Sequence, residues 1–426
     1  MKFTWIRFAL FILLFSAAFS GSSYASPTVE ELNSQIQELM NRVKSLENQK
    51  ESVLKKPAEE KKDSWTNSIK IAGDYRVRFD EVYFPGWNPE RQNQGRWRLR
   101  IRLGFDAAIN EDADFKLRLS TSEDRNVGMA GNPVSTNLTL TNVASKKPVF
   151  VDLGQLDYHP SDVKGLHVIA GKMDLPFLVA GKSDLLWDHD LTLEGGAIKF
   201  KKKNGNMDYS TALGAFMFME RPDSNDSAML GSQIGATYNL PGKKQYITFG
   251  AGYYDFTRAK GEKVFDWQGE NRNYGNTKTS GNLYAFDYNE LEYFLEAGWE
   301  IGTGSKSLPV SVFGNSVKNV VSNVTNNKGW LAGLSVGKLN KPGSLVFRYD
   351  YRKLEKDAVL GAITDSDSFG GGTNGKGHRF SLERQAMKNM SMKLSYFVNR
   401  ANIADDDKDN KDAEYKRLQL EVQTKF

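Results

Sequence analysis

The sequence predicts an all-β protein: a 16-stranded antiparallel transmembrane β-barrel, preceded by a short N-terminal α-helical coiled coil. Three observations predict the barrel. After residue 69, apolar and polar residues alternate in many segments, the connections between these segments alternate between short and long, and the polar positions of the first segments are mainly arginines. A strand with one apolar and one polar face fits a wall between lipid and water. Alternation alone would also fit a soluble β-sandwich.

The first 25 residues have the features of a secretory signal peptide. Lys2 and Arg7 give a positive start, residues 8–19 are apolar except for Ser16, and Ser23-Tyr24-Ala25 precedes Ser26 as a cleavage site of small residues. A retained membrane anchor is the alternative. After residue 25 no apolar run approaches about 20 residues, so the sequence offers no transmembrane helix.

Residues 27–56 are predicted to form a coiled-coil stalk. Two sets of apolar residues repeat every seven positions, Val29, Ile36 and Val43, and Leu32, Leu39 and Leu46. An ordinary amphipathic helix is the alternative, because short isolated helices are marginally stable. The heptads leave the number of chains open. Pro57 ends the helix, and residues 57–68 form a charged linker.

The region 69–426 is predicted to form the barrel, because its apolar residues follow the two-residue period of a strand. The predicted strands are 69–79, 96–109, 113–122, 149–158, 165–173, 194–203, 208–218, 231–240, 245–256, 291–301, 308–317, 329–338, 344–354, 377–386, 390–400 and 414–426.

The predicted connections fall into two classes that alternate along the chain. Short turns include 110–112, 203–206, 240–243 and 340–343. Long polar connections are 80–95, 123–148, 174–193, 257–290, 355–376 and 401–413. An up-and-down membrane barrel has tight turns at one end and long loops at the other, whereas a sandwich has no reason to separate them.

The polar face of the first strands is predicted to be a basic wall inside the barrel. Its arginines are Arg76, Arg78, Arg96, Arg98, Arg100, Arg102 and Arg118. Arginine stays charged at any relevant pH, so these side chains would be costly in a dry core or against lipid. A water-filled channel accommodates them at low cost. Glu292, Glu296 and Glu300 carry the opposite charge, so ion selectivity stays open.

The connection 174–193 is predicted to fold into the barrel and narrow it. Leu185, Leu186 and Trp187 make it unusually apolar for a loop and would pack on the wall. Its acids would face the basic wall and create a transverse field; they are Asp174, Asp184, Asp188 and Asp190. The alternative is that these charges are simply solvated in a wide tube.

Several stretches resemble the putative porin family of Gram-negative outer membranes. They are 98–107, 132–140, 170–177 and 185–197, and the resemblance covers about residues 65–426. The resemblance implies a sixteen-stranded barrel, usually a homotrimer in outer-membrane lipid, that passes small hydrophilic solutes by diffusion. It also implies that the third long loop folds inward and that the outer-membrane barrel assembly machinery reads the terminal Phe426. The stalk is not part of the family pattern and could trimerise or contact peptidoglycan.

We therefore expect an outer-membrane porin, without catalytic residues, metal, cofactor or nucleic-acid partner. Three other functions stay open: a substrate-specific, anion-preferring channel, an envelope tether using the stalk, and an enzyme using His189 between Asp188 and Asp190. The chain has no cysteine, which excludes disulfides and thiolate chemistry. The acidic run 405–409 could bind Ca²⁺ but fits a solvated loop better.

Overall fold

The computed structural model describes residues 29–54, 68–84, 93–123, 131–141, 143–222, 224–242, 244–265, 274–302, 304, 307–404 and 411–426. The predicted signal peptide (1–25), almost all of the predicted linker and the acidic run 405–409 lie outside these ranges. The chain divides into two compact units, Met1–Ser64 and Trp65–Phe426.

The described part of the first unit is one helix, α2 (Val29–Leu54), so the heptad segment is helical. Leu39, Val43 and Leu46 of the heptad pattern are each more than half exposed. An apolar seam that stays exposed in a single chain fits association with other helices, but the coiled coil stays a prediction. No helix among the described residues is both long and apolar enough to cross a membrane.

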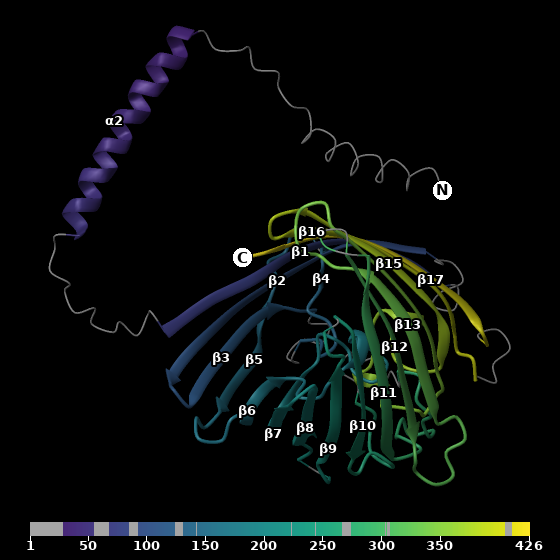
Figure 1. Cartoon of the computed structure of the whole chain (residues 1–426). Helices are drawn as coiled ribbons and strands as arrows, with labels where there is room; N and C mark the ends of the chain where they lie inside the picture. The colour runs from purple at the N-terminus through teal and green to yellow at the C-terminus, as the bar shows by residue number, and fades with distance from the viewer. Residues whose placement is uncertain are drawn as a thin grey trace. The chain divides into compact units, whose positions relative to one another are not determined.

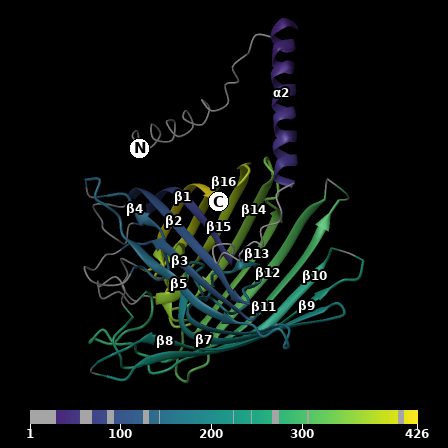
Figure 2. The same ribbon diagram turned by 90° about the vertical axis from the view of Figure 1, so that its left-hand side faces the viewer.

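The second unit is a closed antiparallel barrel (Figure 1). Its described strands are β1 (Ile69–Tyr83), β2 (Asn93–Asn110), β3 (Ala113–Thr121), β4 (Leu138–Thr139), β5 (Val149–Tyr158), β6 (Leu166–Asp174), β7 (Thr192–Asn204), β8 (Met207–Met219), β9 (Ser227–Asn239), β10 (Tyr246–Phe256), β11 (Tyr288–Ile301), β12 (Leu308–Asn319), β13 (Lys328–Gly337), β14 (Leu345–Leu354), β15 (Gly375–Met387), β16 (Met390–Ala401) and β17 (Ala413–Lys425). Long strands that are neighbours in sequence pair with each other, and β1 pairs with β17 from Asp74↔Lys425 to Tyr83↔Lys416, which closes the ring. The strands run obliquely around the barrel (Figure 2), as closure requires.

The predicted sixteen-stranded barrel is confirmed. Of the seventeen strands, β4 is a two-residue segment that adds only to β2, which leaves sixteen long strands in the wall. The sequence could not predict β4, because two residues are too short to show alternation. β1 extends to Tyr83, four residues beyond its predicted end, because Asp80 to Tyr83 pair with both β2 and β17.

The two faces of the wall differ as the alternation predicts. Outward-facing apolar side chains are exposed, as at Ile101, Ile234 and Leu295, where a membrane barrel meets hydrocarbon. The largest buried apolar cluster lies inside the barrel, where loop residues such as Leu185 and Leu360 pack against inward-facing strand residues such as Phe216. The core of this unit is therefore formed by loops folded into the lumen.

Candidate functional site in the barrel lumen

The inner face of the wall has two chemically distinct sides. Toward the long loops, strands β6 to β10 present large apolar and small residues to the lumen, among them Met173, Phe216, Met229 and Gly231. Strands β14, β15, β17, β1 and β2 present alternating arginines and carboxylates, among them Asp350, Arg352, Arg417 and Glu421. A loop with one apolar and one acidic face can therefore bind both sides at once.

The connection between β6 and β7, residues 175–191, packs its apolar side chains on the first side. The rings of Phe177 and Trp187 stack at 6.0 Å, and each lies 4.9 Å from the ring of Tyr254 of β10. Leu185, Leu186 and Trp187 are at most 3% exposed. Each aromatic pair contributes about 0.5–1.5 kcal/mol beyond the apolar area it buries.

The tip of this loop is the 3₁₀ turn η3 (Ala180–Lys182), which lies against β11, β12 and β13. Gly181 N donates to Glu296 Oε2 at 2.7 Å, and Arg348 of β14 donates to the carbonyl oxygens of Gly181 and Lys182. Gly181 has φ +56°, and a Cβ there would lie 2.1 Å from Cγ of Phe313. Only glycine fits this contact without displacing the loop.

Asp184 lies between two arginines of the opposite wall. Arg379 Nη1 donates to Asp184 Oδ2 at 2.6 Å, and Arg352 also binds this carboxylate. Burial by itself would raise the pKa of Asp184, but the charges of Arg352 and Arg379 outweigh burial and hold the pKa well below its usual range. Asp184 is therefore a charged anchor between the loop and strands β14 and β15.

Asp188 is held by backbone amides. It accepts hydrogen bonds from Asp190 N at 2.8 Å and from Ser366 N at 2.9 Å. Burial, followed by the charges of Asp190 and Asp365, raises the pKa of Asp188 well above its usual range. Asp188 therefore ties this loop to the loop after β14 rather than to the basic wall.

Asp190 and Asp174 are the two predicted loop acids that lie beside arginines of the predicted basic wall. Asp190 lies deeper. Its Oδ1 lies 3.5 Å from Arg102 Nη1 and 3.9 Å from Arg100 Nη1, while its Oδ2 accepts from Thr136 N at 3.1 Å. Burial alone would raise the pKa of Asp190, but the nearby arginines lower it. Asp174, at the end of β6, is more exposed and pairs with Arg118 at 3.1 Å.

The seven arginines of the predicted basic wall lie on β1, β2 and β3, and each of them reaches a carboxylate. Arg100 and Arg102 bind Asp74, Arg96 binds Asp80, Arg76 and Arg78 pair with Glu421, Arg98 pairs with Glu123, and Arg118 binds Asp152. Arg76, Arg78, Arg98 and Arg100 are at most 8% exposed. The sequence predicted arginines that line a water-filled channel and face the acids of 174–193, not arginines paired with acids of the wall. The difference arises because β1 and β17 place acids beside the arginines in register, and loops cover the wall.

Exposure of the lumen face is graded along the barrel. On β1, Lys70 near the short-turn end is exposed, whereas Asp74 is 7% and Asp80 is 0% exposed. On β2, Asp106 is exposed, Arg102 is half-buried and Arg98 is buried. Water therefore reaches the lumen face near the short turns, and loops cover this face near the long-loop end.

A second inward loop, residues 355–374, was not predicted. Arg352 Nη1 donates to Asp365 Oδ2 at 2.6 Å, and Asp367 Oδ1 lies 3.0 Å from Arg417 Nη1. Thr364 Oγ1 donates to Leu185 O at 2.8 Å, which joins the two loops. The signal was present in the sequence, since Val359, Leu360, Ile363 and Phe369 make this connection apolar in the same way as 174–193.

Glu292, Glu296 and Glu300 of β11, the three glutamates considered in the sequence, have separate roles. Glu292 is 1% exposed and accepts from Tyr254 Oη at 2.7 Å and from Asn315 Nδ2 at 2.8 Å. Glu296 holds the loop tip, and Glu300 pairs with Lys244 at 3.1 Å near the short turns. They therefore do not form one continuous acidic row facing water.

His189 lies beside Asp184. Its Nδ1 lies 3.6 Å from Asp184 Oδ2, and half of its side chain is exposed. Asp184 is already bound by two arginines. Among the described residues, no group of three His, Cys, Asp or Glu side chains could hold a metal ion.

Phe426 lies at the seam where the barrel closes. Its N donates to Gly73 O at 3.1 Å and its O accepts from Gly73 N at 3.0 Å, and its side chain is exposed. A Cβ at residue 73 would lie 2.6 Å from Cζ of Phe426, so the ring rests on the glycine. The role of Phe426 as an assembly signal stays a prediction.

Comparisons with known proteins agree with this architecture. Solved barrels that resemble it include OprB of Pseudomonas putida at high pH (TM-score 0.53, 12% identity, covering 85% of this chain and 95% of that chain). Another is OmpT of Vibrio cholerae in its trimer form (TM-score 0.45, 12% identity, covering 84% of this chain and 99% of that chain). A third is a triple mutant of the Rhodopseudomonas blastica porin (TM-score 0.44, 11% identity, covering 84% of this chain and 100% of that chain). No curated protein matches the chain. At these identities the likeness to OprB supports the fold alone.

The family is shown by the sequence itself. A family profile described as "Putative porin" matches residues 87–292 and 290–426, which together make up most of the chain. This chain therefore belongs to the putative porin family and forms a β-barrel channel of the bacterial outer membrane.

Proposed function

We propose that the barrel passes small hydrophilic solutes and ions by passive diffusion, and that the loop 174–193 narrows the path against the basic wall. The graded exposure of the lumen face carries this proposal. Water reaches Lys70 and Asp106 near the short turns, whereas Asp80 and Arg98 lie beneath loops at the other end. A solute would move from a wide, wet vestibule into a narrow, charged passage.

The chemistry of the narrow part suits polar solutes. Asp190 on the loop lies opposite Arg100 and Arg102 on the wall. Opposite charges across a short gap produce a transverse field, which orders water and disfavours apolar solutes. Small ions and hydrophilic molecules can exchange hydrogen bonds with both sides.

An anion-preferring channel is the second candidate, and the vestibule favours it. Lys199 and Lys201 of β7 alternate with the outward-facing Ile198 and Phe200, so they line the lumen, and Lys201 is exposed. Deeper in the barrel, the arginines are paired with carboxylates, which offset their charge. We therefore propose a weak preference for anions that arises from these lysines and from Arg102 and Arg118. These two arginines are also paired with carboxylates, but they are the more exposed arginines of the wall.

We further propose a homotrimer in outer-membrane lipid, with the stalk helices associating through the exposed seam of Leu39, Val43 and Leu46. The stalk could then also space the barrel from peptidoglycan. The exposed Phe426 at the closing seam is accessible to the barrel assembly machinery, which supports its proposed role in assembly.

Conductance of the purified full chain in a planar bilayer tests the proposed function. We expect step-like openings, and liposomes containing the protein should swell in small sugars but not in large ones. Replacing residues 178–187 by a short glycine-serine linker should raise the conductance of each step. Folded protein without steps would contradict the channel, and an unchanged conductance in the loop variant would contradict the narrowing.

A further inference from the structure

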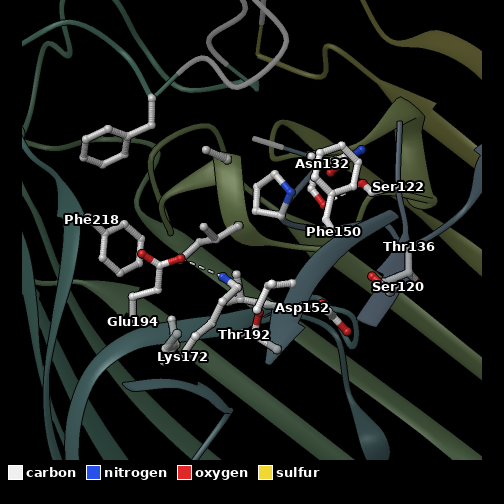
Figure 3. Close-up of a pocket in the computed structure, with 18 of the residues that line it drawn as sticks. Ser120, Ser122, Asn132, Thr136, Phe150, Asp152, Lys172, Thr192, Glu194 and Phe218 are labelled. Atoms are coloured by element: carbon white, nitrogen blue, oxygen red, sulfur yellow. Dashed lines mark hydrogen bonds and ion pairs between the residues drawn. The ribbon is translucent and has the colours of Figure 1, made fainter. Parts of the chain in front are cut away.

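A cavity of about 630 Å³ lies at the long-loop end of the barrel wall (Figure 3). Strand residues from β3, β5, β6, β7 and β8 line it together with loop residues. Glu194, Lys172 and Phe218 lie on one side of the cavity, and Ser120, Thr136 and Phe150 lie on the other (Figure 3). Its lining shares Thr136 and Asp152 with the contacts of Asp190 and Arg118 described above.

The cavity coincides with a gap in backbone pairing. Strands β5 and β6 pair only from Gly154↔Lys172 to Tyr158↔Val168. Residues 149–153 of β5 continue beyond this pairing, bonded to β3 on their other side, and β6 continues to Asp174 beside β7. Between the described residues of these two strands, the wall therefore opens toward the long-loop end.

Residues from both faces of the wall line the same cavity. Val151 and Met217 face outward and are 58% and 50% exposed, as expected for side chains that meet lipid. Ser120, Leu191 and Ile363 belong to the inside and are at most 6% exposed. The cavity therefore reaches from the membrane-facing surface to the loops packed in the lumen.

The lining is mainly apolar, with a charged pair at its outer edge. Apolar side chains come from Phe150, Leu193, Met219 and Phe265. Lys172 Nζ lies 2.8 Å from Glu194 Oε1, and both residues occupy outward-facing positions at the long-loop ends of their strands. Charged side chains on the outer surface are tolerated near the headgroups, so the pair marks the interfacial level.

We propose that this cavity, which we call the wall cavity, binds one acyl chain of a lipid from the surrounding bilayer, with the Lys172–Glu194 pair beside the lipid headgroup. Lipid is the occupant because the cavity opens among side chains that face hydrocarbon. Transfer from bilayer to protein brings no hydrophobic gain, since lipid tails are as apolar as leucine. Van der Waals contact favours binding of an acyl chain in the cavity, because the side chains that line an empty apolar cavity have no atoms to contact on that side.

Photocrosslinking of the full chain tests this proposal. The protein is inserted into phosphatidylethanolamine vesicles that contain a phospholipid with a diazirine near the end of one acyl chain, and adducts are mapped by mass spectrometry. We expect adducts on inner residues of the wall cavity, namely Leu193, Phe265 and Ile363. Adducts confined to outward-facing residues such as Leu213 and Ile234 would overturn the proposal.

A pair of variants on β8 provides a matched comparison. Met217 and Leu213 face outward on the same strand and are each 50% exposed, but only Met217 lines the wall cavity. Met217→Trp should lower the adduct yield on Ile363 at least tenfold, which corresponds to about 1.4 kcal/mol. Leu213→Trp should leave the yield unchanged. An equal effect of both variants, with both barrels folded, would overturn the proposal.

The same surface could instead be covered by a second copy of this chain. The protein has no cysteine, so Met217→Cys introduces a single thiol. We expect this variant to stay monomeric on a denaturing gel after oxidation in vesicles, because lipid covers the residue. A disulfide-linked dimer would assign the wall cavity to a subunit interface and overturn the proposal.

Discussion

Arg379 of β15 donates a hydrogen bond of 2.6 Å to Asp184, which lies 195 positions earlier in the loop between β6 and β7. The same carboxylate binds Arg352 of β14. The apolar part of the loop packs on the opposite side of the lumen, around Trp187 and Tyr254. The loop therefore spans the barrel and is fixed at both sides, which explains why a segment without regular secondary structure can hold one position.

Replacing Asp184 should weaken the attachment of the loop between β6 and β7 to strands β14 and β15. Asp184→Ala removes one carboxylate from Arg352 and Arg379, which both keep Asp350 as a partner. The loss should therefore lie below the about 3–5 kcal/mol of a buried ion pair that is broken completely. We expect a lower free energy of unfolding in urea and noisier single-channel currents. Asp174→Ala is the control, because Asp174 is 60% exposed at its side chain and exposed pairs contribute less than about 1 kcal/mol. Equal losses in the two variants would contradict the anchoring role.

Charge selectivity should depend on the half-buried arginines rather than the fully buried ones. The side chains of Arg102 and Arg118 are 23% and 24% exposed, against 6% for Arg98. We expect Arg102→Ala with Arg118→Ala to shift the reversal potential in a salt gradient toward cations. Arg98→Ala should leave the reversal potential unchanged, although it removes a buried pair with Glu123. The opposite ranking would show that the ion path runs deeper along the wall.

The two loop carboxylates should make stability depend on pH in opposite directions. The pKa of Asp188 is raised by burial and by Asp190 and Asp365, so its contribution is fully present below the pKa of the unfolded chain and is lost as pH rises through the folded value. The pKa of Asp184 is lowered by Arg352 and Arg379 against the effect of burial, so its contribution is present above the unfolded pKa and is lost as pH falls through the folded value.

Asp188→Asn separates these two effects. An amide cannot ionise, so we expect this variant to keep its stability as pH rises, whereas the natural chain loses stability over that range. The loss on acidification should persist in the variant, because Asp184 is unchanged. Urea unfolding followed by tryptophan fluorescence, from acidic to mildly alkaline pH, measures both the loss of stability on acidification and the loss as pH rises. If the variant loses as much stability as the natural chain when pH rises, a group other than Asp188 causes that loss.

The sequence predicted the wall better than the lumen, and the reason is physical. A strand in a membrane barrel must alternate at every position, so segments such as 345–354 show their period without any tertiary information. The inward loops follow no period. Their positions depend on pairs such as Asp184 with Arg379, and nothing local links two residues so far apart in the chain. The acids of 174–193 could be found, but their individual partners could not.

The burial of the arginines could not be predicted from the sequence either. The spacing of Arg98 and Arg100 shows that they share a face, but not that Asp74 and Glu123 neutralise them. Register places Asp74 opposite Arg102 in the pairing of β1 with β2, whereas Glu123 lies in the connection after β3, outside any strand pairing. The apolar character of 355–374 was readable, and applying to it the reasoning used for 174–193 would have predicted the second inward loop.

Gly181 tests the contact at the loop tip. Its φ is positive, and a Cβ added at this position would lie 2.1 Å from Cγ of Phe313, which leaves no room for a side chain. We expect Gly181→Ala to lower the free energy of unfolding by about 1–3 kcal/mol through strain and displacement of η3. Gly205→Ala is the control, because residue 205 also has positive φ but has no atom within 4 Å of its Cβ position. The difference between the two variants isolates the steric part of the effect.

Removal of residues 27–56 tests whether the stalk is needed for the barrel. The barrel closes through β1 and β17, and α2 contributes no strand to it, so the truncated chain should still insert and give step-like conductance. The exposed seam predicts a different change: subunits of the truncated protein should dissociate at lower detergent-to-protein ratios in analytical ultracentrifugation. Val43→Asp with Leu46→Asp in the full chain should reproduce this change, because charges on the seam oppose helix association. Truncated chains that fail to insert would contradict the independence of the barrel, and unchanged assembly in both variants would contradict the coiled coil.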